Sequence, residues 1–543
     1  MPEIQFTPDQ VIAIESEANM VITACPGSGK TSIVVKKIIR EVEDLKSYQG
    51  VIGITFTVKA SKELKKRCKK NGVNTKASFF GTIDHFCLSE IIYPFISRIY
   101  GANVIPLECK LYNELDEELR AGLPDLGAVG NELKTEDYNS YEPIIRELYT
   151  KGVIVLETLG VLSVHVINNS NGCKKYIKSK YTSLYVDEYQ DSSEPQHQLF
   201  ISLLVLGLKA VAVGDIQQSI YAWRGSSPQY IQDLIAKPDV FEHHIVNINH
   251  RCHPSINNYA NRLFNSNSVV QPTEETRVYQ RVYTGDQLSA VQQINDPINK
   301  LVDGGFASSL SEIAILVRSN RSLEFVKNGL TVPFRVYSDD PLSSINTPTT
   351  KALNGLLFYY FDSTFLADDV LETTEQFRIL STTERKEFRK TIKSLRNIPQ
   401  DELKNNLISI CQALIEIDIT KIEENALGRT LDDEFIIKQY KPIDQNEVQV
   451  MTLHKSKGLE FDVVFHLDLY DWVFPRRIYT GNFNEEKFDN WEQELNLHFV
   501  GITRAKKYCL LVSSTRRLNS NDEEKSGNKS QFMTLQELAG LYS

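Results

Sequence analysis

Short runs of β-branched and other apolar residues recur along this chain, and segments with helical spacing of apolar residues separate them. The runs are 20–23, 51–56, 183–186, 210–213, 313–317, 462–465 and 509–512. Continuously apolar strands that alternate with helices are typical of parallel sheets that helices cover on both faces. This pattern predicts an α/β core.

The chain is too long for one hydrophobic core. It has 543 residues, whereas single cores stop growing near ~250–300 residues. Two stretches, roughly 90–180 and 366–444, lack these recurring apolar runs and contain amphipathic helical segments such as 401–417. We interpret both stretches as helical subdomains inserted into the α/β cores.

Composition and charge restrict the class of protein. With 41% hydrophobic and 24% charged residues, the chain is neither disordered nor fibrous. Its net charge of −10 argues against a protein that coats nucleic acid or membranes through bulk charge. The eight scattered cysteines form no metal-ligand pattern, and we find no signal-like segment and no apolar run approaching ~18 residues. We expect a soluble, cytoplasmic protein.

A phosphate site is predicted where the first apolar run meets a helical pattern. Its residues are Ala24, Cys25, Pro26, Gly27, Ser28, Gly29, Lys30 and Thr31, followed by Ser32. Glycines at such a junction let backbone N–H groups surround phosphates, the lysine reaches the β- and γ-phosphate oxygens, and the threonine hydroxyl binds Mg²⁺. Ala24 replaces the first glycine of the usual pattern. A chance Gly-Lys-Thr in a loop is the alternative, and the strand and helix on either side argue against it.

Two adjacent carboxylates follow the apolar run 183–186. Asp187 is placed to hold Mg²⁺ directly or through water, and Glu188 to orient and deprotonate an attacking water. An Asp-Glu pair is also common in turns, but together with Lys30 and Thr31 it predicts a site for nucleotide hydrolysis. Such a site also needs an arginine from elsewhere in the chain.

An ordered series of motifs resembles the UvrD/Rep/PcrA-like DNA helicases of superfamily 1. The matching segments are 6–10, 54–60, 81–86, 187–191, 213–225, 249–251, 450–461 and 500–505. The resemblance implies two RecA-like P-loop parallel-sheet cores, each with an inserted, mainly helical accessory subdomain. The ranges we expect are 1–89 and 178–245 for the first core, 90–177 for its insert, 246–365 and 445–543 for the second core, and 366–444 for its insert.

The resemblance also implies roles in the nucleotide site, with ATP and Mg²⁺ as cofactors. Gln10 would recognise adenine, and Gln218 would sense the γ-phosphate. Arg251 and Arg504 would supply cations from the second core, and Glu460 would contact the ribose or stabilise the site. A single arginine is otherwise most often half of a surface ion pair, and the motif context reverses that interpretation for these two.

For single-stranded DNA, the family pattern implies aromatic surfaces on which successive bases stack. The stacking residues would be Phe56, Tyr221 and Trp223, and the residues near the backbone would be Arg224, Thr57, Thr82, His85 and His454. Base–aromatic stacking is worth ~1–3 kcal/mol per base and tolerates any sequence, which suits a motor. Without the motif, Trp223 would be interpreted as a core tryptophan. Stacking does not distinguish DNA from RNA, so DNA rests on the resemblance.

The chain departs from the family pattern in several places. His250 replaces the tyrosine that stacks on adenine, and its ring offers less surface. The segment 493–496 replaces the charged residues that precede the sixth motif, and 519–520 replaces a stacking aromatic. The accessory insert of the second core is short for the family, in which this subdomain contacts duplex DNA and regulates unwinding.

Basic segments exist despite the acidic total, at 59–70, 174–180 and 385–396. A charge run is most often a solvated helix face. The first segment abuts a DNA-binding motif and is expected to serve the backbone track. For the third, in the accessory insert, a duplex contact and a solvated face remain equal alternatives. We expect salt-sensitive binding along a narrow track.

We therefore predict an ATP-dependent translocase on single-stranded DNA and a 3′-to-5′ DNA helicase that acts at single-strand/duplex junctions, with no membrane partner. The polarity comes from the resemblance alone. The alternative is an ATP-gated DNA-sensing subunit that regulates a partner nuclease and unwinds little itself. Compact UvrD-like proteins occur beside an OLD-family nuclease in the Gabija anti-phage system, and the short accessory insert favours this alternative.

Overall fold

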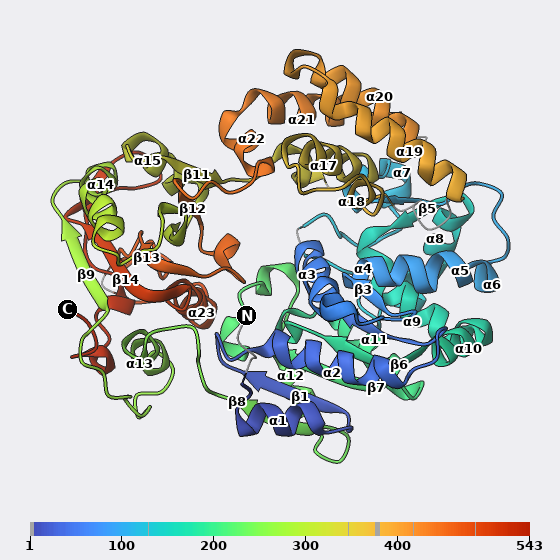
Figure 1. Ribbon diagram of the computed structural model, residues 1–543, viewed down its shortest axis with the longest axis horizontal. Coiled ribbons are helices and arrows are strands. Elements are labelled where there is room, and N and C mark those ends of the chain that lie inside the picture. The colour runs from blue at the N-terminus through green and yellow to red at the C-terminus, as the bar shows by residue number, and fades with distance from the viewer. Residues whose placement is uncertain (1–4, 129, 346, 375–380, 416–417, 484) are drawn as a thin grey trace. The chain divides into compact units, whose positions relative to one another are not determined.

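The computed structural model describes residues 5–128, 130–345, 347–374, 381–415, 418–483 and 485–543. Its contacts divide the chain into two compact units, Met1–Arg251 and Cys252–Ser543. In each unit helices pack on one main sheet (Figure 1). Residues 416–417 of the amphipathic segment 401–417 lie outside the described residues, as do short parts of both predicted inserts.

The first unit is built on a six-stranded parallel sheet with the strand order β3-β2-β6-β7-β1-β8. Its strands are β1 Met20–Ala24, β2 Gly50–Ile54, β3 Phe79–Gly81, β6 Tyr181–Val186, β7 Lys209–Gly214 and β8 Glu242–Val246. The central strands are buried along nearly their whole length, because β-branched side chains pack against helices on both faces. The predicted strands at 20–23, 183–186 and 210–213 all lie in this sheet, and the predicted strand at 51–56 ends two residues early, at Ile54.

The second unit contains another six-stranded parallel sheet, with the order β11-β12-β10-β13-β14-β9. Its strands are β9 Val278–Tyr283, β10 Ile313–Val317, β11 Phe334–Tyr337, β12 Val448–Thr452, β13 Phe461–His466 and β14 Ala505–Ser514. A short hairpin, β15 Arg516–Leu518 and β16 Glu524–Ser526, follows. Two parallel sheets with packed helices confirm the predicted α/β fold with two cores of the RecA-like type.

Helices account for most of the remaining regular structure. In the first unit they are α1 Pro8–Glu15, α2 Lys30–Asp44, α3 Val58–Lys69, α4 Ile83–Phe86, α5 Tyr93–Phe95, α6 Ser97–Tyr100, α7 Glu117–Arg120, α8 Tyr138–Thr150, α9 Leu159–Asn169, α10 Asn171–Lys180, α11 Glu194–Val205 and α12 Gln229–Ile235. In the second unit they are α13 Pro254–Arg262, α14 Gln287–Asp303, α15 Asn320–Gly329, α16 Pro341–Ile345, α17 Pro348–Phe361, α18 Ala367–Leu371, α19 Thr382–Ser394, α20 Leu403–Ile415, α21 Lys421–Asp432, α22 Glu434–Tyr440 and α23 Trp491–Ile502.

Each unit carries a helical region between the strands of its sheet. In the first unit, α5 to α10 surround a two-stranded sheet of β4 Glu108–Lys110 and β5 Val153–Val155. In the second unit, α16 to α22 enclose a hydrophobic cluster of their own. This cluster includes α16 and α17, which precede residue 366. The domain boundaries drawn from the sequence stay a proposal.

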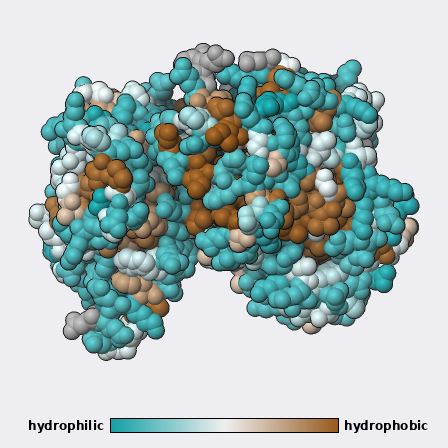
Figure 2. Space-filling view, turned by 90° about the horizontal axis from the view of Figure 1, so that it is seen from below, coloured by the Kyte–Doolittle hydropathy of each residue, from teal (hydrophilic) through white to brown (hydrophobic). Residues whose placement is uncertain are grey.

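The surface is mostly polar. Hydrophilic residues predominate on the face in Figure 2, and hydrophobic residues form scattered patches. Among the described residues, no helix combines the length and the apolar character needed to cross a membrane. The eight cysteines all lie in the described part of the chain; none forms a disulfide, and seven of them are buried.

A buried histidine pair joins β13 to α23 in the second unit. The Nδ1 of His466 contacts the carbonyl oxygen of Leu467 at 3.1 Å, so this nitrogen carries the proton. The Nδ1 of His498 then donates to the Nε2 of His466 at 3.0 Å. The Nε2 of His498 is buried without a hydrogen-bond partner among the described residues. Burial lowers the pKa of His466 to about 4 and lowers the pKa of His498 well below its ordinary value, so both rings are neutral.

This pair makes stability decrease as the pH falls. Histidines of the unfolded chain take up protons below a pKa of about 6.5, whereas the folded pair stays neutral. The pair therefore makes its full contribution to the free energy of unfolding above pH 6.5. This contribution is lost as the pH falls toward 4. His498→Phe keeps the aromatic ring that stacks on Phe532 and removes one titrating group. We expect its unfolding free energy to fall less steeply between pH 6.5 and 5, by up to ~1.4 kcal/mol per pH unit.

Urea unfolding measures this difference through the fluorescence of Trp472 and Trp491, which both lie in the second unit. His85→Phe, at an exposed position, is the control and should keep the wild-type pH dependence. Equal slopes for the wild type and His498→Phe would contradict the assignment of a neutral buried pair.

Candidate functional site

Five segments with predicted site residues begin at the carboxyl edge of the first sheet. The phosphate loop follows β1, Phe56 follows β2, Thr82 follows β3, Asp187 follows β6 and Asp215 follows β7. Parallel strands end at the same edge of a sheet, so this arrangement gathers residues that are distant in sequence. Strands β6, β7 and β1 are neighbours, and β2 and β3 lie beyond β6.

The phosphate loop has the backbone of an anion cradle. Gly27 and Gly29 adopt positive φ angles of 69° and 77°, and Gly29 is the N-cap of α2. The N–H and the hydroxyl of Ser28 both donate to the carbonyl oxygen of Cys25. A Cβ at Gly27 would lie only 2.4 Å from the Cβ of Arg251. The loop therefore needs glycine at these positions and directs N–H groups at the start of α2 toward an anion.

Lys30 and Thr31 meet the carboxylates at the ends of β6 and β7. The Nζ of Lys30 is buried, has no hydrogen-bond partner among the described residues, and lies 4.0 Å from Oδ2 of Asp215. The hydroxyl of Thr31 donates to Oδ2 of Asp187 at 3.2 Å. A buried ammonium group without a hydrogen bond is costly unless a ligand supplies an acceptor. These residues fit a nucleotide phosphate and Mg²⁺.

Thr31 and Asp187 together offer two oxygen ligands to a metal ion. In the part of the chain that the structure describes, no group of three or more His, Cys, Asp or Glu side chains could hold a metal. Mg²⁺ usually takes one or two protein ligands and completes its octahedron with water and substrate phosphates. The pair is therefore sufficient for Mg²⁺ that arrives with a nucleotide.

Burial shifts the ionisation of these carboxyl groups. Burial and the neighbouring Glu188 raise the pKa of Asp187, and the Lys30 ammonium opposes this shift. Burial also raises the pKa of Asp215, against the effect of Lys30 and of a hydrogen bond from Gln218. A divalent cation or a further positive charge at this edge would favour the ionised forms.

A chain of side-chain bonds joins Glu188 to Gln218. Gln190 donates through Nε2 to Oε2 of Glu188 at 2.5 Å, and its Oε1 accepts the backbone N–H of Asp215 at 2.9 Å. Gln218 donates to Oδ2 of Asp215 at 2.6 Å. Glu188 has a φ of +56°, a conformation that costs a non-glycine residue ~1–3 kcal/mol and that gathers at functional sites. The sequence analysis missed Gln190 and Asp215, although both lie inside quoted motifs.

Segment 249–251 lies on the phosphate loop. The backbone N–H of His250 donates to the carbonyl oxygen of Gly27 at 3.1 Å, and the Asn249 side chain accepts the N–H of Arg251 at 2.8 Å. We expected Arg251 to come from the second core, and the contact division groups it with the first unit. Hydrogen bonds within one unit thus hold His250 and Arg251 next to the phosphate loop.

Two more side chains support this loop. The amide of Gln10 donates to the carbonyl oxygen of Ser28 at 2.7 Å, and its Oε1 accepts the N–H of Thr7 at 2.7 Å. Arg67, which the sequence analysis did not single out, extends from α3 and donates to the hydroxyl of Ser32 at 2.7 Å. Arg67 lies within the basic segment 59–70, so that charge run was the available signal for it.

The second unit holds Glu460, Arg504 and His454. Arg504 is only 1% exposed and donates to the carbonyl oxygens of Val500 and Leu459, which places it next to Glu460. Both residues precede the amino ends of β13 and β14, whereas His454 follows the carboxyl end of β12. The structure thus brings Glu460 and Arg504 together and does not bring His454 to them.

The predicted stacking residues form one aromatic cluster. The rings of Phe56 and Tyr221 are 5.0 Å apart and nearly parallel, and Trp223 meets Tyr221 edge-on at 6.3 Å. The Arg224 guanidinium lies over Tyr221 and Trp223. Phe56 is 39% exposed and Trp223 is 45% exposed. An exposed aromatic surface with a cation suits stacked bases and a phosphate backbone.

The three polar candidates of the first unit lie close to the ends of β2 and β3. Thr57 caps α3 by accepting the N–H of Ala60, and Thr82 caps α4 by accepting the N–H of His85. His85 is exposed and packs against Phe79. The adjacent strands β2 and β3 bring these residues to the sheet edge that also carries Phe56.

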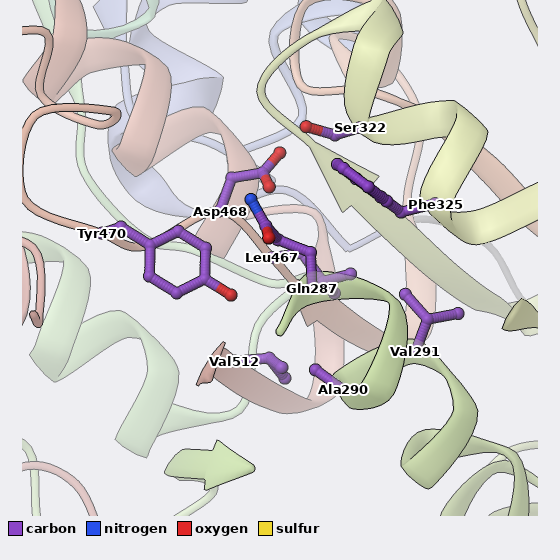
Figure 3. Close-up of a pocket in the computed structure, with 9 residues that line it drawn as sticks. All are labelled: Gln287, Ala290, Val291, Ser322, Phe325, Leu467, Asp468, Tyr470 and Val512. Carbon is purple, nitrogen blue, oxygen red and sulfur yellow. The ribbon is translucent and has the colours of Figure 1, made fainter. Parts of the chain in front are cut away.

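A small cavity in the second unit is separate from these residues (Figure 3). Asp468, Tyr470 and Gln287 are among the polar residues of its wall. The carboxylate of Asp468 accepts the backbone N–H of Arg318, and the hydroxyl of Tyr470 bonds to that of Ser514. None of the predicted site residues lines this cavity, and its polar groups are bonded within the protein.

Comparison with known proteins identifies relatives along most of the chain. The AAA domain model matches residues 9–224, and the UvrD-like helicase C-terminal domain model matches residues 363–517. The chain is 29% identical over 528 residues to the Gabija protein GajB of Bacillus cereus (strain VD045), which covers 93% of this chain and 94% of that protein. It is 24% identical over 628 residues to the ATP-dependent DNA helicase PcrA of Staphylococcus epidermidis (strain RP62A), at 93% and 82% coverage.

Lys30→Ala removes the buried cation beside Asp187 and Asp215. We expect hydrolysis of ATP to fall by at least ~10²-fold, because such groups stabilise charge that develops in the transition state. Release of phosphate measures the rate. Lys36→Ala, on the exposed side of the same helix, is the matched control and should retain wild-type activity. Undiminished hydrolysis by a folded Lys30→Ala protein would contradict the phosphate site.

Proposed function

Because the chain is homologous to UvrD-like helicases over most of its length, we propose that it is an ATP-dependent translocase on single-stranded DNA and a 3′-to-5′ DNA helicase. The observation that carries this proposal is the shared sheet edge. A phosphate cradle, whose Lys30 ammonium has no hydrogen bond among the described residues, and an exposed aromatic cluster both extend from that edge. Homology to an ATP-dependent helicase supports ATP as the nucleotide.

In the proposed reaction, Thr31 and Asp187 hold Mg²⁺, which neutralises charge on the phosphate oxygens. Glu188, oriented by Gln190, positions the attacking water and takes its proton. The cations of Lys30, Arg251 and Arg504 stabilise the transferred phosphoryl group together with Gln218. Other residues of the loop bind the triphosphate through backbone N–H groups.

The remaining nucleotide contacts are proposed from the family pattern and their location. Gln10 and His250 contact the adenine base, beside the loop to which their own atoms are bonded. Arg67 adds a cation near the start of α2. Glu460 contacts the ribose or stabilises the site, and its position next to Arg504 lets both act from the second unit.

The hydrogen bonds that join Glu188 to Gln218 would let a change at the nucleotide affect the DNA site. Gln218 is followed after two residues by Tyr221, so the same loop carries a nucleotide sensor and a stacking ring. We propose that hydrolysis changes the Asp215–Gln218 bond and shifts the loop that bears Trp223. A change at one end of this short, bonded loop reaches its other end directly.

In the proposed DNA site, bases stack on Phe56, Tyr221 and Trp223. Phe56 and Tyr221 now cover one another, so a base enters between them only when the two rings separate. Arg224, Thr57, Thr82, His85 and His454 contact the backbone. Exposed members of the basic segment 59–70 extend this track, and the resulting electrostatic attraction weakens as salt concentration rises.

A second candidate function is an ATP-gated DNA sensor that controls a partner nuclease, of the OLD-family type. The observation in its favour is the nearly end-to-end match to GajB, at 94% of that protein. The alignment to PcrA spans 628 residues, more than the 543 residues of this chain, and so requires insertions relative to it. The compact accessory region of the second unit fits a regulatory role.

Trp223→Ala tests the stacking site. We expect the Kd for a single-stranded oligonucleotide to rise ~5- to 150-fold, since stacking is worth ~1–3 kcal/mol per base. Fluorescence anisotropy measures the Kd at two salt concentrations. Tyr48→Ala, at an exposed tyrosine of the same unit, is the control and should bind as the wild type does. Unchanged affinity in Trp223→Ala would exclude this ring from the DNA site.

Strand displacement separates the two functions. The motor should displace the labelled strand of a duplex with a 3′ single-stranded tail, in an ATP-dependent manner, and act poorly on a 5′-tailed duplex. The sensor should hydrolyse ATP faster when single-stranded DNA is added but displace no strand. Lys30→Ala serves as the inactive control. A rate of ATP hydrolysis that does not respond to DNA would argue against both functions.

A further inference from the structure

A turn of the helical insert packs directly against the loop that carries Trp223 and Arg224. Gly130 has a φ of +86°, and a Cβ there would lie 2.0 Å from the Cα of Arg224 and 2.8 Å from the carbonyl oxygen of Trp223. Gly225, with a φ of +74°, faces it, and a Cβ at this glycine would lie 2.7 Å from the carbonyl oxygen of Gly130. Backbone meets backbone here, so neither glycine can carry a side chain without displacing the other loop.

The residues after Gly130 are bonded to the segment that follows the strand end with Asp187. The hydroxyl of Ser193 donates to Oε2 of Glu132 at 2.6 Å. The backbone N–H of Thr135 donates to Oε2 of Glu194 at 2.9 Å. Ser193 is the N-cap of α11 and follows the carboxylate motif by two residues. Segment 130–135 therefore contacts both the stacking loop and the start of α11.

A third contact joins the stacking loop directly to the start of α11. The backbone N–H of Ser227, just after the stacking loop, donates to the carbonyl oxygen of Ser192 at 3.1 Å. On the insert side, the Asn131 side chain donates to the carbonyl oxygen of Asp125 at 3.2 Å, and its N–H donates to that of Ala128 at 3.0 Å. Gly130 is thus held on its other side by hydrogen bonds within the insert.

We propose that segment 130–135 is a positioning element that makes the rate of ATP hydrolysis depend on bound single-stranded DNA. The inference rests on the proposed function and adds residues outside every motif that resembles the helicases. When bases stack on Trp223, the loop moves against Gly130. Glu132 and Thr135 then transmit the shift to Ser193 and Glu194, beside the turn that carries Glu188.

Gly130→Ala tests this element, because its new Cβ forces the stacking loop away. We expect the rate without DNA and the KM for ATP to stay at wild-type values. The stimulation by saturating single-stranded DNA should fall at least ~5-fold, the low end of ordinary coupling between two sites. The matched control is Gly101→Ala in the same insert, because Gly101 also has a positive φ, +92°, but a Cβ added there would have nothing within 4 Å of it. This control should be stimulated as the wild type is.

Glu132 provides a second, independent pair of variants. Glu132→Ala removes the acceptor for Ser193 and should lower the DNA stimulation without raising the KM for ATP. Glu132→Gln retains an oxygen acceptor in the same place and should restore the stimulation. A purely structural defect in Glu132→Ala would also lower the rate of hydrolysis without DNA, whereas loss of the positioning role lowers only the ratio of the rates with and without DNA. This pair also decides the question if Gly130→Ala does not fold.

The outcomes separate this inference from the proposed function. Wild-type protein that hydrolyses ATP at one rate with and without DNA would overturn both. The positioning role alone would be overturned if DNA stimulated the wild type and Gly130→Ala equally. If Gly130→Ala does not fold, equal stimulation of the wild type and Glu132→Ala would overturn it. Loss of stimulation in these variants, with Gly101→Ala and Glu132→Gln unaffected, would support it.

Discussion

Parallel strands end at one edge of a sheet, and the candidate site of the first unit depends on this constraint. The neighbours β6, β7 and β1 end in Asp187, Asp215 and the phosphate loop, whereas β2 and β3 end near the aromatic cluster. The strand order therefore places the phosphate loop and the aromatic cluster at the same edge of one sheet. In the proposed function, the nucleotide site and the surface for nucleic acid of the first unit need no separate domains, because a single hydrogen-bonded ladder orients both.

The charged groups at this edge are only partly paired with one another, since the ammonium of Lys30 lies 4.0 Å from Oδ2 of Asp215. Buried polar groups in folded proteins are normally hydrogen-bonded, but the ammonium of Lys30 has no such bond among the described residues, and Asp187 and Asp215 have raised pKa values through burial. Asp215 is instead bonded to side chains that lead away from the site: its backbone N–H donates to Gln190, and its carboxylate accepts from Gln218. These bonds connect the end of β7 to the loop that bears Tyr221 and Trp223, which the turn at Gly130 contacts.

The central strands could be predicted from the sequence, and most strands that escaped prediction are edges. Strands such as β2, β10 and β13 are buried along their length and show continuous apolar runs. The missed strands β3, β8, β9 and β11 are the four edges of the two sheets. An edge strand such as β8 is largely exposed, with the sequence Glu-His-His-Ile-Val, so it lacks the apolar signal. The fifth strand missed in the two six-stranded sheets, β12, is interior, but buried Gln449 interrupts its apolar pattern.

Local sequence alone predicted the phosphate loop and the carboxylate pair, because each depends on a few consecutive residues between one strand and the next element, whereas the aromatic residues came only from the resemblance to the helicases. Tertiary structure alone decided which distant segments meet. Arg67 reaches Ser32, Gln190 spans Glu188 and Asp215, and Gly130 lies against Arg224. No periodicity or propensity encodes these contacts, because they arise only when strand order and helix packing bring separate loops to the same edge of the sheet.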